Sequence, residues 1–441
     1  MAEPADQSSW SATFGQQLTM HHLLPFSLRV GFTWRDRATV VEELARRLPR
    51  GFEVRARDFD NLGFRRLPES YRRRYSGWLQ IIVPHHYLEH LDRRRQSIIG
   101  TFRTACPQPI GLPFVEILLM SSGLGTIRIT HDVAWNTCVD LRRIHASQSA
   151  FIQSFFKSGA RNPDLPDDLL SLLLPVRNAM LAAPKAHEDS RYQLAEQAGL
   201  TWPIVDFFVG LVVCTGQDHA PDPPRWQQLL VAQEIECITA RPTPVSADSI
   251  LSCEALLVVA WDESILAFAG RSSTDRDEQL RNAVEFFTLG TMHWTGLYDT
   301  DQLLYEALPF LFERGRSYGK LQLIRGVQAH LAELQHESKA VYLAEHEDDQ
   351  KILSRIFEAW ETEDLLSNLD KKSTMLMGIV SRLNDERLRD VGVFFTVLSL
   401  IGIVSNLGQH RQWDITGWLW SGAAMAVAVI GWWVLRRAGR S

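Results

Sequence analysis

The chain has 441 residues, of which 45% are hydrophobic and 22% charged, and its formal net charge at pH 7 is -6. This length and composition exclude a disordered or fibrous protein and provide for a buried core in two or three domains. The five cysteines form no C-x-x-C pair, which excludes a disulfide framework or a structural zinc site of usual spacing and is typical of a reducing compartment.

The first 160 residues are predicted to form an N-terminal α/β domain. Expected strands cover residues 27–33, 51–57 and 78–83, and expected helices cover 38–48 and 87–102. Residues 116–130 then give an apolar strand, a turn and a second strand, which predicts a hairpin, and a helix-like segment follows at 138–156.

Residues 161–300 are predicted to hold a helical segment and then a second hairpin and helix. Proline-containing loops are expected at 162–166 and 220–225, on either side of the helical section. Residues 254–268 align without a gap with 116–130 and lead into a helix at 277–287. An internal β–β–α duplication and a chance likeness between two short hairpins both explain this.

Residues 301–390 are predicted to form a helical stalk, because no proline follows Pro309 and apolar residues recur at spacings of three and four. Residues 345–390 are long enough for one helix of about 65 Å. The stripe either packs back on the preceding domain or joins copies of the chain, and we favour self-association. Its acidic residues form a solvated helix face or hold a divalent cation, and the solvated face is favoured. They are Glu345, Glu347, Asp348, Asp349, Glu358, Glu361, Glu363 and Asp364.

Two uncharged apolar runs, 391–407 and 415–435, predict a transmembrane hairpin. A bilayer core of about 30 Å needs roughly 20 residues of helix, and hydrocarbon requires every backbone polar group to be paired within the segment. Tryptophans cluster near both ends of the second run. Arginines precede the first run, and three more lie in the tail at 436–441. The positive-inside rule therefore predicts a multi-pass protein of the inner (plasma) membrane with both termini in the cytoplasm.

Other candidate sites are less specific. Arginine clusters at Arg72, Arg73 and Arg74 and at Arg93, Arg94 and Arg95 either bind phosphate or form solvated helix faces. His86 and His90 lie four residues apart, as zinc ligands on a helix do, but the sequence indicates no further ligand, so we predict no metal site. No catalytic or nucleic-acid-binding motif is present, and we predict neither an enzyme nor a nucleic-acid partner.

The order of a cytoplasmic α/β region, a long helix, a first span, a short linker and a second span ending in basic residues resembles the CorA-type divalent-cation channels. The resemblance implies a homo-oligomer, a pentamer in that family, whose first span lines a pore. At the outer end of that span the family has Gly-Met-Asn, whereas this chain has Val404-Ser405-Asn406-Leu407-Gly408. Magnesium selectivity is therefore not carried over, and a divalent cation is the only ligand that the resemblance implies.

The resemblance also assigns expected roles to residues of the hairpin. Ser405, Asn406 and Gly408 would stand at the pore mouth and Ser399 inside the pore, while Arg436 and Arg437 would form a cytoplasmic basic ring.

The predicted fold class is thus a mixed α/β (α+β) cytoplasmic region, a helical stalk and a two-helix transmembrane hairpin. Two functions follow from it. One is a CorA-like channel or transporter gated by its cytoplasmic domain. The other is a membrane-tethered sensor or effector of a bacterial signalling or defence system, without transport. In either case the partners expected are the lipid bilayer, further copies of the chain, and a small ligand or protein at the cytoplasmic domain.

Overall fold

The computed structural model describes about half of the first 372 residues and a few positions after them. The described residues are 17–58, 77–87, 109–134, 167–183, 186–188, 209–217, 255–259, 263–269, 274–312, 347–372, 374–376, 378, 379, 382, 396, 399 and 422. The chain divides into two compact units, Met1–Lys372 and Ser373–Ser441. The first unit is an α+β domain. The described residues of the second are helical.

Within the described residues, eight strands form one sheet in the order β3-β4-β5-β6-β1-β8-β10-β9. They are β1 (Gln17–Ser27), β3 (Glu53–Asp58), β4 (Gly77–Ile82), β5 (Pro109–Met120), β6 (Leu124–Ala134), β8 (Val209–Gln217), β9 (Ala255–Val259) and β10 (Glu263–Ala269). Neighbouring strands are antiparallel except β8 and β10, which are parallel. Two short strands, β2 (Val30–Phe32) and β7 (Ala186–Glu188), pair separately.

Both predicted hairpins are confirmed, as β5–β6 and β9–β10. The strands expected at 51–57 and 78–83 correspond to β3 and β4, and the helix expected at 38–48 corresponds to α1 (Arg37–Arg47). The helices expected at 138–156 and, past Tyr87, at 87–102 lie outside the described residues.

The sequence prediction was wrong about β1 and β8. The strand expected at 27–33 is only the three-residue β2, and the long strand Gln17–Ser27 precedes it. Residues 209–217, assigned to a helical section, form β8 and pair with β1. β1 is an interior strand between β6 and β8, and its side chains enter the cores on both faces of the sheet, so no alternation of polar and apolar residues marks it. Pro25 lies past Leu23, where the β8 pairing ends, so its missing N–H breaks no bond to that strand.

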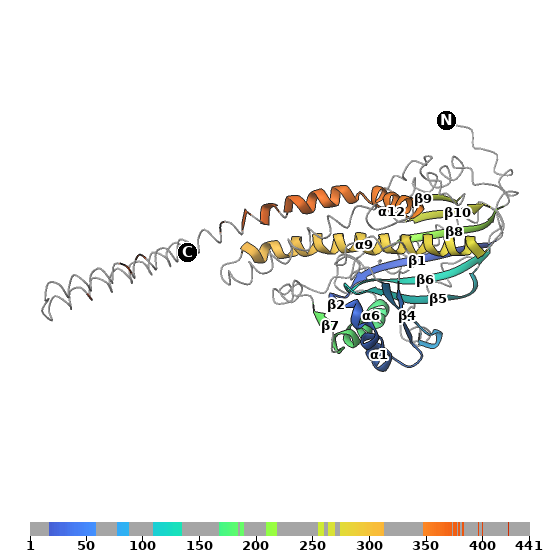
Figure 1. Ribbon diagram of the computed structural model, residues 1–441, viewed down its shortest axis with the longest axis horizontal. Helices are drawn as coiled ribbons and strands as arrows, with labels where there is room; N and C mark the ends of the chain where they lie inside the picture. The colour runs from blue at the N-terminus through green and yellow to red at the C-terminus, as the bar shows by residue number, and fades with distance from the viewer. Residues whose placement is uncertain are drawn as a thin grey trace, which may run out of the picture. The chain divides into compact units, whose positions relative to one another are not determined.

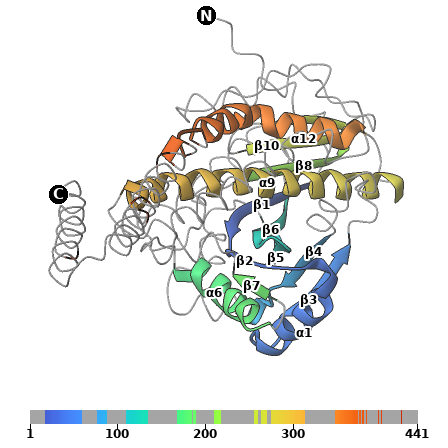
Figure 2. The same ribbon diagram turned by 60° about the vertical axis from the view of Figure 1, so that its left-hand side comes forward.

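Helices cover both faces of the sheet (Figures 1 and 2). On one face, α1 and α6 (Asp167–Leu181) enclose a core that includes Leu79, Ile117 and Ile127. On the other, α9 (Thr274–Phe312) and α12 (Glu347–Ala359) enclose a core that includes Trp78 and Leu118. Successive residues of β4 and β5 thus enter different cores, as strand geometry requires.

Helix α9 is far longer than the helix expected at 277–287, and it runs through the position at which the predicted 161–300 segment ends. Its central part is buried although it contains several threonines. Thr288, Thr291 and Thr295 each donate their hydroxyl to the backbone carbonyl four residues earlier, at 2.7 to 2.9 Å. These bonds satisfy the hydroxyls inside the helix, so a polar sequence is accommodated in a core.

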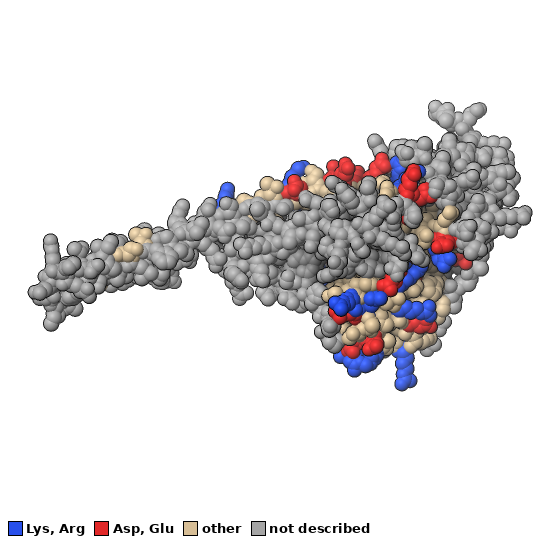
Figure 3. Space-filling model, in the orientation of Figure 1, with Lys and Arg blue, Asp and Glu red and all other residues tan. Residues whose placement is uncertain are grey.

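The helix expected to run unbroken from 345 to 390 is interrupted. Helix α12 ends at Ala359, Glu361 has a positive φ of 47°, and a new helix covers residues 362–372. Acidic residues on both sides of the interruption are exposed, among them Glu347, Glu358 and Glu363, and acidic side chains gather over α12 in Figure 3. The solvated acidic face is therefore confirmed for Glu347, Glu358 and Glu363, but it was wrong for Asp349, which is only 8% exposed and belongs to the buried residues of α12.

No helix within the described residues is both long and apolar enough to cross a bilayer. Apart from Thr396, Ser399 and Gly422, the predicted spans at 391–407 and 415–435 lie outside those residues.

The turn between β5 and β6 requires glycine at position 123. Gly123 has a φ of 87°, and a Cβ there would lie 2.5 Å from the backbone oxygen of Val30. We expect Gly123→Ala to lower the free energy of unfolding by about 2 kcal/mol, from the left-handed backbone and the contact together. Thermal unfolding of the purified chain in detergent measures this effect.

Gly378→Ala is the matched control for that substitution, because Gly378 is helical and an added Cβ would meet nothing within 4 Å. It should leave the midpoint unchanged or raise it slightly. Equal midpoints for Gly123→Ala and the parent chain would show that the turn adapts without cost.

Candidate functional site

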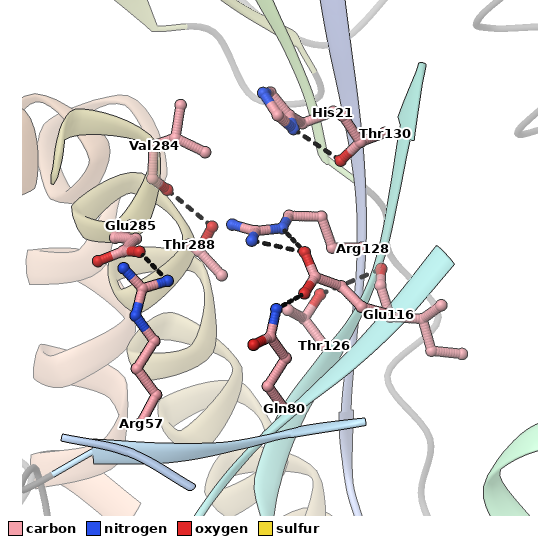
Figure 4. A network of polar contacts seen from close by, with 11 residues as sticks. His21, Arg57, Gln80, Glu116, Thr126, Arg128, Thr130, Val284, Glu285 and Thr288 are labelled. Carbon is pink, nitrogen blue, oxygen red and sulfur yellow. Dashed lines mark hydrogen bonds and ion pairs between the residues drawn. The ribbon is translucent and has the colours of Figure 1, made fainter. Parts of the chain in front are cut away.

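A buried group of charged side chains lies between the sheet and α9 (Figure 4). Its centre is Glu116 of β5, a residue that is 1% exposed. Arg128, directly opposite on β6, donates from Nε at 2.6 Å and contacts the same carboxylate oxygen through Nη2 at 2.5 Å. Gln80 of β4 donates to the other oxygen at 2.5 Å. Three adjacent strands thus join through one carboxylate, in the low-dielectric setting where charge-assisted bonds are strong.

Helix α9 places a second carboxylate in this group. Glu285 is 5% exposed, and its Oε1 lies 2.5 Å from Nη1 of Arg57 on β3. Burial raises the pKa of the Glu285 carboxyl, while Arg57, then Arg128 and Arg281, oppose that rise. The helix is therefore attached to the edge strand of the sheet by an ion pair whose acidic partner is almost removed from water, as Figure 4 shows.

A second ion pair joins α9, further along the helix, to the connection between β1 and β2. Nη2 of Arg29 lies 3.3 Å from Oδ1 of Asp299, and the two side chains are 3% and 1% exposed. Arg29 connects β1 to β2 and has a φ of 54°, in the left-handed region. A non-glycine residue in this region is held there by its surroundings, and the buried ion pair and the backbone bond from Leu28 N to Gly123 O, 2.8 Å, both contribute.

Of the three histidines in β1 and β6, only His21 lies on the face of the sheet that meets α9. Nδ1 of His21 is 3.0 Å from Oγ1 of Thr130, and burial lowers the pKa of His21 to about 3, with Arg128 adding to the effect. On the opposite face of the sheet, the rings of His22 and His131 stack with centroids 4.9 Å apart. Burial lowers the pKa of His131 to about 3 and that of His22 well below its ordinary value, so both rings are neutral at pH 7.

This arrangement is suited to holding α9 in one register. Each of the two carboxylates, Glu116 and Glu285, is paired with an arginine, and His21 is neutral at pH 7. Directional ion pairs between helix and sheet fix the helix more narrowly than apolar packing does, because a shift of one residue breaks them. In the described part of the chain, no group of three or more His, Cys, Asp or Glu side chains is placed to bind a metal ion.

Two of the predicted site residues are described. Ser399, the expected pore-lining residue, is helical and exposed. His86 is exposed, and its Nε2 donates a hydrogen bond to the backbone oxygen of Arg50 at 3.2 Å. This bond uses one of the two ring nitrogens through which His86 could bind zinc. The others lie outside the described residues: Ser405, Asn406, Gly408, Arg436, Arg437, Arg72, Arg73, Arg74, Arg93, Arg94, Arg95 and His90.

Sequence reasoning missed the interface between the sheet and α9, although one signal was available. Glu116 and Arg128 lie at equal distances in sequence from the centre of the β5–β6 turn, so a regular antiparallel hairpin places them opposite each other on the same face. A single acid in one apolar strand facing a single base in the next predicts a buried cross-strand pair. Arg57 and Glu285 had no such signal, because their contact depends on how α9 crosses the sheet.

Comparisons with protein-family models, with curated proteins and with solved structures found no match for this chain.

Proposed function

We propose that the chain is a CorA-like, homo-oligomeric membrane protein whose α+β domain controls the passage of ions through a pore formed by its first span. The observation that carries this proposal is the pair of uncharged apolar runs at 391–407 and 415–435, with arginines before the first and after the second. The helix at 362–372 precedes these runs and supports the proposal, since a gating domain needs a rigid connection to its pore.

The interface between the sheet and α9 supports a controlling role for the domain. Its two ion pairs to α9 come from different places: Arg57, on the edge strand β3, binds Glu285, and Arg29, in the connection between β1 and β2, binds Asp299. A helix held by discrete buried pairs has a small number of stable positions, which is the property that a switching element requires. A small ligand or a protein partner that alters one of these pairs would shift the helix.

A membrane-tethered sensor or effector of a bacterial signalling or defence system is the second candidate. It is favoured by the sequence Val404-Ser405-Asn406-Leu407-Gly408, which keeps only the asparagine of the family motif for hydrated magnesium. In this case the hairpin would anchor the domain and conduct nothing. Both proposals place the two termini in the cytoplasm, so protease added outside intact cells should leave the domain uncut.

Reconstitution in liposomes separates the two functions. We expect the purified chain to form a discrete pentamer and to admit divalent cations, measured with a trapped indicator dye. Asn406→Ala should change the divalent flux at least severalfold, because a side-chain amide at a pore mouth contacts the hydrated ion.

Asn368→Ala is the matched control in the flux assay, since Asn368 is an exposed asparagine on the helix 362–372. It should leave the flux unchanged. A chain that stays monomeric or dimeric and conducts no ion contradicts the channel and supports the tethered sensor. A conducting pentamer that is indifferent to Asn406→Ala removes that residue from the pore mouth.

A further inference from the structure

The chain changes direction between α12 and the helix 362–372. The amide of Trp360 donates to Ile356 O at 3.0 Å, as in an α-helix, but the amide of Glu361 donates to Glu358 O, three residues back, at 3.2 Å. The amide of Leu365 then donates to Glu361 O at 3.1 Å and begins the next helix. The α-helical bonding pattern is thus interrupted at Glu361 and resumes with the amide of Leu365.

Glutamate is a poor residue for this bend. Glu361 has a φ of 47°, the left-handed conformation that ends many helices and that glycine usually provides. For a residue with a Cβ this conformation costs about 1 to 2 kcal/mol. Glutamate also propagates a helix well. Local preference therefore favours a continuous helix through residue 361, and contacts from elsewhere in the domain must maintain the bend.

Those contacts come from the aromatic residues of α9. Nε1 of Trp294 donates to the backbone oxygen of Trp360 at 3.1 Å. The Trp360 ring is 2% exposed and meets the rings of Trp294 and Phe287 edge to face, with centroids 6.0 and 6.1 Å apart. In a continuous helix the Trp360 oxygen would accept from the amide of Asp364 instead. The indole N–H of Trp294 thus occupies the acceptor that straightening would use.

A third contact holds the helix beyond the bend. Nζ of Lys372 lies 2.6 Å from Oδ1 of Asp301, seven residues further along α9 than Trp294. Helix α9 therefore makes two contacts with this segment, one at the bend through Trp360 and one at the end of the following helix through Lys372. Both contacts are with α9, the helix that the buried ion pairs fix on the sheet.

We infer that Trp360 and Glu361 form a two-state joint. The joint is bent in this structure because Trp294 of α9 binds the Trp360 carbonyl. When α9 moves or the indole bond breaks, Glu361 returns to the right-handed helical conformation and α12 fuses with residues 362–372 into one helix. The joint thereby converts the position of α9 into the direction of the helix 362–372. Its bearing on ion passage rests on the proposed function, whereas the two states of the joint do not.

The two states differ in the distance between positions on either side of the bend. Ser354 and Asn368 are both exposed, so spin labels on ketone-bearing amino acids at these positions leave the packing and the native cysteines intact. In a continuous helix their Cα atoms would lie about 21 Å apart along the axis, the rise of fourteen residues. In the bent form the distance is shorter. Double electron–electron resonance on the full chain in detergent measures the ratio of long to short distances.

Two variants shift that ratio in opposite directions. Trp294→Phe combined with Glu361→Ala removes the indole donor and favours the continuous helix, so we expect the ratio of long to short distances to rise about tenfold. Glu361→Gly relieves the left-handed residue and should abolish the long distance. A double variant that retains circular dichroism of the parent but gives only the short distance would overturn the joint. So would a broad distribution without a peak near 21 Å, which indicates local unfolding.

The distance measurement does not depend on conduction, so the joint and the proposed pore are tested separately. A normal shift in distances from a chain that conducts no ion supports the joint and contradicts the pore. A conducting pentamer whose distances do not respond to either variant contradicts the joint and supports the pore.

Discussion

Replacement of Arg128 by methionine is expected to lower the free energy of unfolding by about 3 to 5 kcal/mol, the usual cost of leaving one partner of a buried ion pair uncompensated. Glu116 would keep only the amide of Gln80 as a donor at the centre of the sheet, while remaining 1% exposed. Chemical denaturation of the purified chain, followed by tryptophan fluorescence, gives the difference.

A second substitution, at Glu116, shows whether the stability lost in Arg128→Met comes from the unpaired carboxylate. Arg128→Met combined with Glu116→Leu removes both charges and should recover most of the lost stability. Arg55→Met is the matched control, because Arg55 pairs with Glu53 on the exposed edge of the sheet, with side chains 63% and 58% exposed. We expect no resolvable shift for it. If Arg128→Met and Arg55→Met unfold at the same denaturant concentration, water reaches Glu116, and the interface between the sheet and α9 does not exclude solvent.

Mild acid is expected to destabilise the domain strongly through the stacked pair of His22 and His131. The folded state holds both rings neutral, with the pKa of His131 lowered to about 3 and that of His22 well below its ordinary value. The unfolded chain binds protons near pH 6.5. Stability is therefore insensitive to these residues above pH 6.5 and falls below it by about 1.4 kcal/mol per pH unit for each ring. From pH 7.5 to 5.5 the pair should cost about 3 kcal/mol.

Glu285 opposes this loss of stability in acid, and substitution of His22 measures how much of the loss comes from one buried ring. The raised pKa of Glu285 makes the folded state bind a proton more readily than the unfolded chain, so it adds a little stability as the pH falls toward the lower end of the range. His21, whose pKa is also lowered to about 3, adds a similar loss, so His22→Gln should remove about one third of the loss between pH 7.5 and 5.5 in thermal unfolding. His86→Gln, at an exposed histidine, should leave it unchanged. A parent chain with equal midpoints at both pH values would show that the two buried rings are protonated without unfolding.

The elements that sequence predicted correctly are those whose signal is local. The β5–β6 and β9–β10 hairpins have short turns between apolar strands, and α1 has an amphipathic repeat, so each can be recognised from a dozen residues. β1 and β8 could not be recognised in this way, because both are interior strands of the sheet. Their pairing, from Gln17–Thr215 to Leu23–Val209, joins distant parts of the chain.

The interface was hidden for a related reason. The polar residues of α9, such as Thr288 and Glu285, look like a solvated face until the sheet is placed against them. Likewise, nothing in the helix-favouring sequence around Glu361 indicates a bend, because the residue that maintains the bend, Trp294, belongs to another helix. Local pattern thus predicted the elements, and the contacts between elements determined the site.

The place of β1 in the middle of the sheet has a consequence for biosynthesis. Residues 17–27 leave the ribosome early, but their second edge stays unpaired until β8 has been synthesised, and the last of the described strands, β10, ends at Ala269. Pairing between segments so distant in sequence favours slow folding and chaperone dependence. All eight strands have nevertheless been translated before the apolar runs at 391–407 and 415–435 emerge. The described strands can therefore pair before either apolar run has left the ribosome.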